Sequence, residues 1–199
     1  MTENGWETSP AYLPGITVVI PTIPPRKTLL RRAIGSVLGQ SLPAAAISVA
    51  VDLDKEGSAA TRNRALATVQ TEWTAFLDDD DQFLPNHLEL LASCQAATGA
   101  DVVYPWPEMV GAGDPRPDRF GKPFDAAELR RSSYIPVTSL VRTRLAQVVK
   151  FRWRKDTPYD DHAFYLGLLN LNAKFVHLPQ RTWLWNVQGQ NTSGQPDRW

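Results

Sequence analysis

Short apolar runs alternate with segments of helical periodicity along the first half of the chain. The apolar runs, rich in β-branched and aromatic residues, occupy 16–20, 47–51, 73–77 and 101–104. Between them, apolar side chains recur at helical spacing over 27–40, 57–69 and 85–97. Uninterrupted apolar runs of this length are typical of buried strands in a parallel sheet. The alternation predicts an α/β protein with a Rossmann-like, mostly parallel central sheet flanked by helices.

The pattern is less regular beyond residue 105. The segment 105–123 is rich in Pro, Gly and Asp, which favours a long loop. Helices are predicted over 139–149 and 163–171, and a short strand over 174–178. The polar and aromatic stretch 181–199 is expected to lie across the surface.

Polar residues follow each of the first three predicted strands. They are Pro21-Thr22, Asp52-Leu53-Asp54 and the run Asp78 to Asp81. Ligands of open α/β sheets bind beyond the carboxyl ends of the strands. We therefore expect the three strand ends to face one crevice.

The run Asp78 to Asp81 admits three interpretations. A solvated acidic turn that caps a helix starting at Pro85 accounts for one or two of the aspartates. An EF-hand loop would use Asp78, Asp80, Gln82, Asn86 and Glu89. Its sixth position needs Gly but holds Phe83, and a strand precedes it instead of a helix.

The third interpretation is a divalent-cation site for a phosphorylated ligand, and it is the one we favour. Asp78-x-Asp80 offers two carboxylates at alternate positions directly after a strand. Mg²⁺ and Mn²⁺ prefer such oxygen ligands together with substrate phosphates. The pattern thus predicts Asp78 and Asp80 as metal ligands.

Asp52-Leu53-Asp54 suggests a different chemistry. An apolar strand ending in D-x-D is similar to the nucleophile motif of haloacid dehalogenase-like phosphatases. That motif has Thr or Val two residues after its second Asp, whereas Lys55-Glu56 follows here. A phosphatase or phosphotransferase that uses Asp52 is therefore an alternative function.

Length, charge and cysteine content narrow the choices further. The 199 residues predict an N-terminal tail over 1–14 and a single domain over 15–199. The 21 basic and 21 acidic residues balance, which disfavours nucleic acid as a partner, although a local basic patch would still allow it. Cys94 is the only cysteine, and neither a secretory signal nor an apolar run of transmembrane length is present. We expect a cytoplasmic protein.

Several segments, in order, resemble glycosyltransferase family 2, whose members have the GT-A nucleotide-diphospho-sugar fold. The segments are TVVIPTIPPRKTLLRRAIGSVLGQS, GSAATRNRALATVQTEWTAFLDDDDQFLPNHLELL, YIPVTSLVRTRLAQVVKFRW and YDDHAFYLGLLNLNAKFVHLP. The resemblance covers roughly residues 15 to 195, and its ordered set is more specific than any single motif. It implies a nucleotide-sugar-binding half over 15–110 and an acceptor half over 111–199.

The resemblance also implies roles for the donor site. Pro21, Thr22 and Ile23 would line the nucleotide pocket. Asp52, with Asp54 as a substitute, would accept hydrogen bonds from the base, and Arg62 would contact the nucleotide or its phosphates. In the D-x-D pair of Asp78 and Asp80, Asp80 would be the direct ligand of Mn²⁺ or Mg²⁺. Asp79 would hold ribose or sugar hydroxyls, and Asp81 would orient the site.

The activity implied is that of an inverting, metal-dependent glycosyltransferase of the hexosyltransferase type. A nucleoside-diphosphate sugar, by family default a UDP-sugar, would donate to a hydroxyl acceptor of unknown identity. Asp161 matches the catalytic Asp and would act as general base, while Asp160 stands where Glu is commoner. Helix N-capping is the alternative for this pair. A protein that binds a nucleotide sugar without catalysis is a further alternative.

Three departures from the family pattern qualify these expectations. Only Lys55 to Thr61 separates the second strand from Arg62, so the base pocket is expected to be abbreviated. Gln188 stands where many members carry a His that supports the diphosphate. The absence of a membrane helix argues against a processive polysaccharide synthase.

Overall fold

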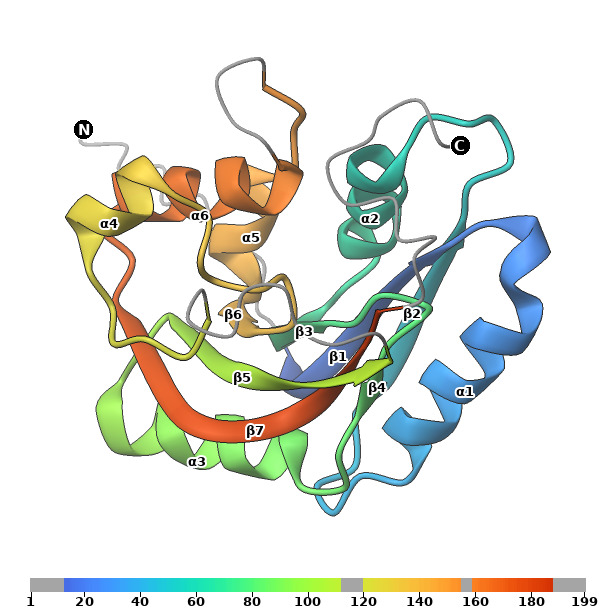
Figure 1. The fold of residues 1–199 in the computed structure, drawn as a ribbon, viewed down its shortest axis with the longest axis horizontal. Helices are drawn as coiled ribbons and strands as arrows, with labels where there is room; N and C mark the ends of the chain where they lie inside the picture. The colour runs from blue at the N-terminus through green and yellow to red at the C-terminus, as the bar shows by residue number, and fades with distance from the viewer. Residues whose placement is uncertain (1–12, 112–119, 155–158, 188–199) are drawn as a thin grey trace, which may run out of the picture.

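The computed structural model describes residues 13–111, 120–154 and 159–187 (Figure 1). The strands are β1 (Leu13–Thr22), β2 (Ala46–Val51), β3 (Thr71–Phe76), β4 (Gln82–Phe83), β5 (Val102–Gly111), β6 (Leu140–Arg142) and β7 (Phe175–Val187). The helices are α1 (Lys27–Leu38), α2 (Ser58–Ala67), α3 (His87–Thr98), α4 (Ala126–Arg131), α5 (Thr143–Val149) and α6 (Asp160–Asn170), with a 3₁₀ turn, η1, at Pro24–Arg26.

All seven strands form one sheet in the order β2-β1-β3-β6-β5-β7-β4. Strand β1 pairs in parallel with β2 and β3, and β5 pairs in parallel with β7. Strand β6 is antiparallel to both β3 and β5, and β4 is antiparallel to β7. Five strands thus run in one direction and two in the other, which confirms the predicted mostly parallel α/β sheet.

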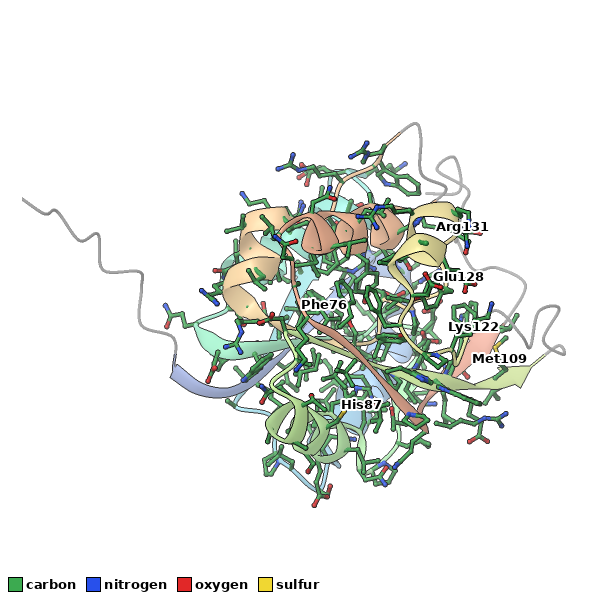
Figure 2. All side chains as sticks on the ribbon, turned by 90° about the vertical axis from the view of Figure 1, so that its left-hand side faces the viewer. Phe76, His87, Met109, Lys122, Glu128 and Arg131 are labelled. Carbon is green, nitrogen blue, oxygen red and sulfur yellow. The ribbon has the colours of Figure 1, made fainter. Side chains whose placement is uncertain are left out.

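Helices cover both faces of the sheet, and each face has its own apolar cluster. On β1, Val19 packs toward α2, α5 and α6, whereas Val18 and Ile20 pack toward α1 and α3. Figure 1 shows α3 below the curved strands β5 and β7, α1 at the right-hand side, and α2, α4, α5 and α6 above the strands. In Figure 2, Phe76 lies among the side chains of the upper layer and His87 among those of the lower.

His87 is packed as a neutral core residue. Its ring stacks on Phe83 at 3.8 Å between centroids, and Nδ1 lies 2.8 Å from the Thr182 hydroxyl. Complete burial lowers the pKa of His87 to about 3. The contact joins α3 to β7 beneath the sheet.

The second half of the domain differs from its sequence-based prediction. Strand β5 continues to Gly111, although a loop was expected from 105, because it pairs with β7 along this whole stretch. Pro105 and Pro107 fall where the register shifts, so their missing N–H groups do not interrupt a regular ladder. Residues 181–187, expected on the surface, form the end of β7, and Trp183 and Asn186 are buried.

Further elements were missed or misassigned, among them the short strand β4 and the turn η1. Leu140 to Arg142 form strand β6 between β3 and β5, and the helix predicted over 139–149 begins only at Thr143. Helix α4 was not predicted. It is capped by Asp125, whose Oδ1 accepts from the N–H groups of Ala127 and Glu128.

Some expectations lie outside the described residues: most of the predicted tail over 1–14, the part of the loop at 112–119, and Gln188. No helix in the described ranges is long and apolar enough to span a bilayer. The cytoplasmic location stays a prediction.

Candidate active site

A polar cavity of about 120 Å³ lies beyond the carboxyl ends of β1 and β3. Its walls come from the ends of these strands, from the N-terminal parts of α2 and α6, and from loops of the second half. The predicted site residues that line it are Pro21, Thr22, Ile23, Arg62, Asp78, Asp79, Asp80 and Asp161. The fold thus brings together eight of the predicted positions from four separate segments.

The aspartates after β3 are divided between two tasks, and three of them form a cluster. Oxygens of Asp78, Asp80 and Asp81 lie within 4.8 Å of one another. Asp81 Oδ1 accepts from the N–H of Asn186 at 2.9 Å, and the Asn186 side chain donates to the backbone oxygen of Asp80 at 2.7 Å. Strand β7, through Asn186, therefore holds the cluster in position.

This cluster fits a divalent cation. Burial, then the negative charge of Asp78, raises the pKa of Asp80 to about 6, and burial and Asp80 raise the pKa of Asp81 well above its ordinary value. Crowded carboxylates repel one another when ionised. They suit Mg²⁺ or Mn²⁺, which bind hard oxygen ligands. Asp81, expected only to orient the site, joins Asp78 and Asp80 as a candidate ligand.

Asp79 has a different environment. Its Oδ2 accepts from the Thr22 hydroxyl at 2.5 Å, and its Oδ1 accepts from Arg26 Nη1 at 2.8 Å. Burial raises the pKa of Asp79, opposed by these hydrogen bonds. Asp79 thus joins the end of β1 to the acidic run, while its predicted contact with ribose or sugar hydroxyls stays a prediction.

Arg62 connects the acidic run to the second acidic pair. Its Nη2 donates to Asp78 Oδ1 at 2.8 Å and its Nη1 to Asp160 Oδ2 at 2.9 Å. The guanidinium is 4% exposed, and its carbon lies 4.7 Å from the centre of the Phe151 ring. Burial alone would lower the pKa of Arg62, but Asp160 and Asp78 outweigh it and keep the group charged. Arg62 bridges two carboxylates here, and its contact with a nucleotide stays a prediction.

Asp160 and Asp161 begin α6 without capping it through their side chains. The N-cap position is Tyr159, which makes no side-chain capping bond. Asp160 is tied across the cavity to Arg62 and to the Ser58 hydroxyl at 3.0 Å, and Asp161 Oδ1 accepts from the N–H of His162 at 2.7 Å. Burial, then the charge of Asp160, raises the pKa of Asp161 to about 7. Asp161 therefore changes protonation state near neutral pH.

Asp52 and Asp54 are not among the residues that line the cavity. Asp52 is 4% exposed, and its two oxygens accept from the N–H groups of Glu56 at 2.9 Å and Gly57 at 2.8 Å. Asp54 is exposed. The ends of β1 and β3 meet in the cavity as expected, whereas the acidic residues after β2 stabilise their own loop.

Sequence reasoning missed several residues of the site: Arg26, Ser58, Trp153, Trp185 and Asn186. Arg26 had a local signal, because it follows the predicted strand end and is basic. Ser58 and Trp153 lie within the quoted motif segments but carry no charge that marks them, and Asn186 is 105 residues from Asp81. No local pattern reports contacts of that range.

Solved structures that are similar to this chain include the following three. S. aureus TarS 1–349 matches with a TM-score of 0.69 and 18% identity over 86% of this chain and 60% of that chain. The same TarS fragment in complex with UDP-GlcNAc matches with a TM-score of 0.66 and 18% identity over 87% of this chain and 59% of that one. The mannosyltransferase PcManGT from Pyrobaculum calidifontis, in complex with GDP-Man and Mn²⁺, gives 0.63 and 16% over 92% and 60%.

These likenesses establish a fold of the GT-A type. The chain spans about 60% of the length of these solved chains. Among curated proteins, no sequence matches this chain. The family model of glycosyl transferase family 2 matches residues 47–155, more than half of the sequence, and the chain belongs to that family.

Proposed function

We propose that the protein transfers a sugar from a nucleoside-diphosphate sugar to a hydroxyl acceptor, with inversion at the anomeric carbon. One observation carries the proposal: a single cavity is lined by three clustered carboxylates and by Asp161, an aspartate whose pKa is about 7. The UDP-GlcNAc and GDP-Man complexes of the two similar proteins support the donor class. A UDP-sugar is the expected donor.

Mn²⁺ or Mg²⁺ would be held by Asp78, Asp80 and Asp81. When bound, the ion would stabilise the charge that develops on the leaving diphosphate. The chain's own contribution is to hold these carboxylates in place, with Asn186 behind Asp81 and Arg62 beside Asp78.

Asp161 would accept the proton of the attacking hydroxyl. Its Oδ1 is occupied by the His162 N–H, so Oδ2 is the oxygen assigned to this proton. A pKa near 7 suits a general base at neutral pH, because a large fraction is ionised while the group still binds a proton well. Attack from the side of Asp161, opposite the diphosphate, leads to inversion.

The alternatives are less well supported. A nucleophilic Asp52 would need an oxygen in the cavity, yet both of its oxygens bind the N–H groups of its own loop. A non-catalytic nucleotide-sugar-binding protein would not need Asp161 at a pKa of about 7. The division into a donor half over 15–110 and an acceptor half over 111–199 stays a proposal, with Asp161 and Trp185 contributed by the second half.

Calorimetry tests the donor site. UDP, GDP, CDP and dTDP are titrated with Mn²⁺ and with EDTA into the wild type, Asp80→Asn and the matched control Asp54→Asn. We expect metal-dependent binding of at least one diphosphate, lost in Asp80→Asn and kept in Asp54→Asn. Absence of binding to every diphosphate by folded wild type would contradict the proposal.

Turnover tests the base. Release of the diphosphate from the matching nucleotide sugar is measured for wild type and Asp161→Asn. The variant is expected to bind the donor normally and to lose roughly 10²- to 10⁴-fold in rate. Equal rates would remove Asp161 from the mechanism, and the loss of activity in Asp52→Asn with unchanged Asp161→Asn would favour a phosphotransfer reaction.

A further inference from the structure

A chain of contacts leads from the end of β1 to Trp153. The backbone N–H of Asp52 donates to the Thr22 oxygen at 2.8 Å, and Asp52 Oδ2 accepts from the N–H of Gly57, also at 2.8 Å. Trp153 Nε1 lies 3.9 Å from the position that a Cβ on Gly57 would occupy. Trp153 therefore stands where β1, β2 and the N-terminus of α2 come together, at one end of the cavity.

The indole of Trp153 is available to a ligand. It lines the cavity and is 42% exposed. The cavity has two other aromatic walls, but each lies beside acidic residues: Tyr159 precedes Asp160, and Trp185 precedes the Asn186 that binds Asp81. Trp153 instead adjoins Gly57, in the loop between β2 and α2.

The segment that carries Trp153 is held firmly in place. Asn63 binds the backbone of Phe151 on both sides, donating to its oxygen at 2.8 Å and accepting from its N–H at 2.9 Å. The Phe151 ring is 1% exposed and stacks on Phe164 with 4.0 Å between centroids. Lys150 has a φ of +58°, a strained value for a residue with a side chain. Such strain persists only where the surroundings impose it, so the position of Trp153 is built into the fold.

The connection between β2 and α2 leaves a role for such a side chain. It consists of residues 52–57 only, since β2 ends at Val51 and α2 starts at Ser58. Asp52, the residue expected to bind the base, has its oxygens committed to this loop. The end of β1 contributes Pro21, Thr22 and Ile23, none of them aromatic. Trp153, from a segment about a hundred residues further along the chain, covers this end of the cavity instead.

We propose that Trp153 is the nucleobase-contacting residue of the donor site, with the face of its indole stacked on the base of the nucleoside diphosphate. The assignment rests on the proposed function, because it assumes that the diphosphate lies at the acidic cluster. Stacking on an aromatic face is worth a substantial part of the affinity and is tolerant of base identity. Trp153 therefore contributes affinity for the nucleoside and little selection among bases.

The test separates the base from the diphosphate. Binding of UDP, GDP and inorganic pyrophosphate, each with Mn²⁺, is measured for wild type, Trp153→Phe and Trp153→Ala. For Trp153→Ala we expect a loss of about 5- to 150-fold in affinity for both nucleotides and unchanged affinity for pyrophosphate. Trp153→Phe should retain most of the affinity, because it keeps an aromatic face. Pyrophosphate is the control for folding and for the metal site, since it lacks a base.

Each other outcome overturns the assignment in a distinguishable way. Equal losses for nucleotides and pyrophosphate would make Trp153 a structural residue of the cavity wall. Unchanged nucleotide affinity with slower sugar transfer would place it on the acceptor side. Wild type that binds pyrophosphate but no nucleotide would show that the cavity lacks a base site. Wild type that binds neither would remove the proposed function itself, and this inference with it.

Discussion

Two acidic clusters follow strands of the same sheet, Asp52-Leu53-Asp54 after β2 and Asp78 to Asp81 after β3. They differ in where their hydrogen-bond partners come from. Asp52 finds its hydrogen-bond donors, the N–H groups of Glu56 and Gly57, within six residues of its own loop. The aspartates after β3 instead contact Arg26, Arg62 and Asn186, all from other elements. A carboxylate whose hydrogen-bond donors come from its own loop stabilises that loop. Carboxylates that are crowded together need donors or a cation from elsewhere to offset their repulsion.

The position of each strand in the sheet explains the difference. Strand β2 lies at the edge and β3 lies between β1 and β6. The end of β3 is therefore surrounded by η1, α2, α6 and β7, which supply Arg26, Arg62, further carboxylates and Asn186. The end of β2 has fewer neighbours, so its loop must satisfy itself. The same D-x-D pattern thus gives a site only where the topology brings other elements to it.

The largest expected effect contrasts the two clusters as cation sites. Mn²⁺ binding without nucleotide is measured for Asp78→Asn/Asp80→Asn and for Asp52→Asn/Asp54→Asn. The first pair removes two ligands and should weaken binding by more than about 100-fold, beyond what outer partners of ligands cost. The second pair should bind as wild type does. Equal losses in both would erase the distinction between the clusters.

The second prediction concerns stability against pH in the metal-free protein. Asp161, with a pKa of about 7, and Asp81, with a pKa well above normal, keep protons in the folded state that the unfolded chain has lost. Each of these carboxyl groups therefore lowers stability as pH rises from about 4, where the unfolded group ionises, through its raised folded pKa; the part of this fall between about pH 6.5 and 8 is roughly 1 kcal/mol. Below this window, the buried His87 acts in the opposite direction, because its pKa is lowered.

Urea unfolding in EDTA at the two pH values measures this loss. Added Mn²⁺ should remove the part of the loss that comes from Asp81, because the ionised carboxylates of the cluster then have a cation between them, and should leave the part that comes from Asp161. Asp161→Asn should show a smaller loss than wild type. Stability that rises across the window in EDTA would contradict the crowding described for the cluster.

The third prediction breaks the loop of the other cluster. Asp52→Ala leaves the N–H groups of Glu56 and Gly57 without their acceptor and should cost about 1–3 kcal/mol in the free energy of unfolding. Affinity for the nucleoside diphosphate should change little, because Asp52 does not line the cavity. Urea unfolding and calorimetry on the same sample measure both. Unchanged stability with lost affinity would restore the role of Asp52 as a ligand of the base.

The smallest expected effect is a shift in the pH dependence of turnover. The charge of Asp160 raises the pKa of Asp161, so Asp160→Asn should lower it. The rate rises with pH as Asp161 ionises, and this acidic limb should move to lower pH by about one unit. A limb that stays in place would show that Asp161 titrates independently of Asp160, or that another group sets the limb.

Local patterns were sufficient for the first half of the domain. The apolar runs and helical spacings place β1, β2, β3, α1, α2 and α3 within a few residues, and the strand-end rule places Pro21, Thr22 and Asp78 in one cavity. The same rule also predicted that Asp52 would face this cavity, which it does not line. The rule takes no account of where a strand lies in the sheet.

Elsewhere the information is not local. The extension of β5 and β7 depends on their mutual pairing, which overrides the loop signal of Pro105 and Pro107. Strand β6 is only three residues long, and its strand conformation depends on pairing with β3 and β5 on either side. The bridging role of Arg62 depends on Asp160, 98 residues away.

The hydrogen bond from Asn186 to Asp81 joins two residues that are synthesised at different times. During synthesis, the acidic run leaves the ribosome about a hundred residues before its anchor does. Strand β4, which directly follows the run, pairs with Leu184 and Trp183, which are also synthesised about a hundred residues later. A growing chain can therefore fold its first three strands early and still lack a finished acidic cluster. The proposed cation site is therefore complete only once Asn186, near the end of β7, has joined the domain.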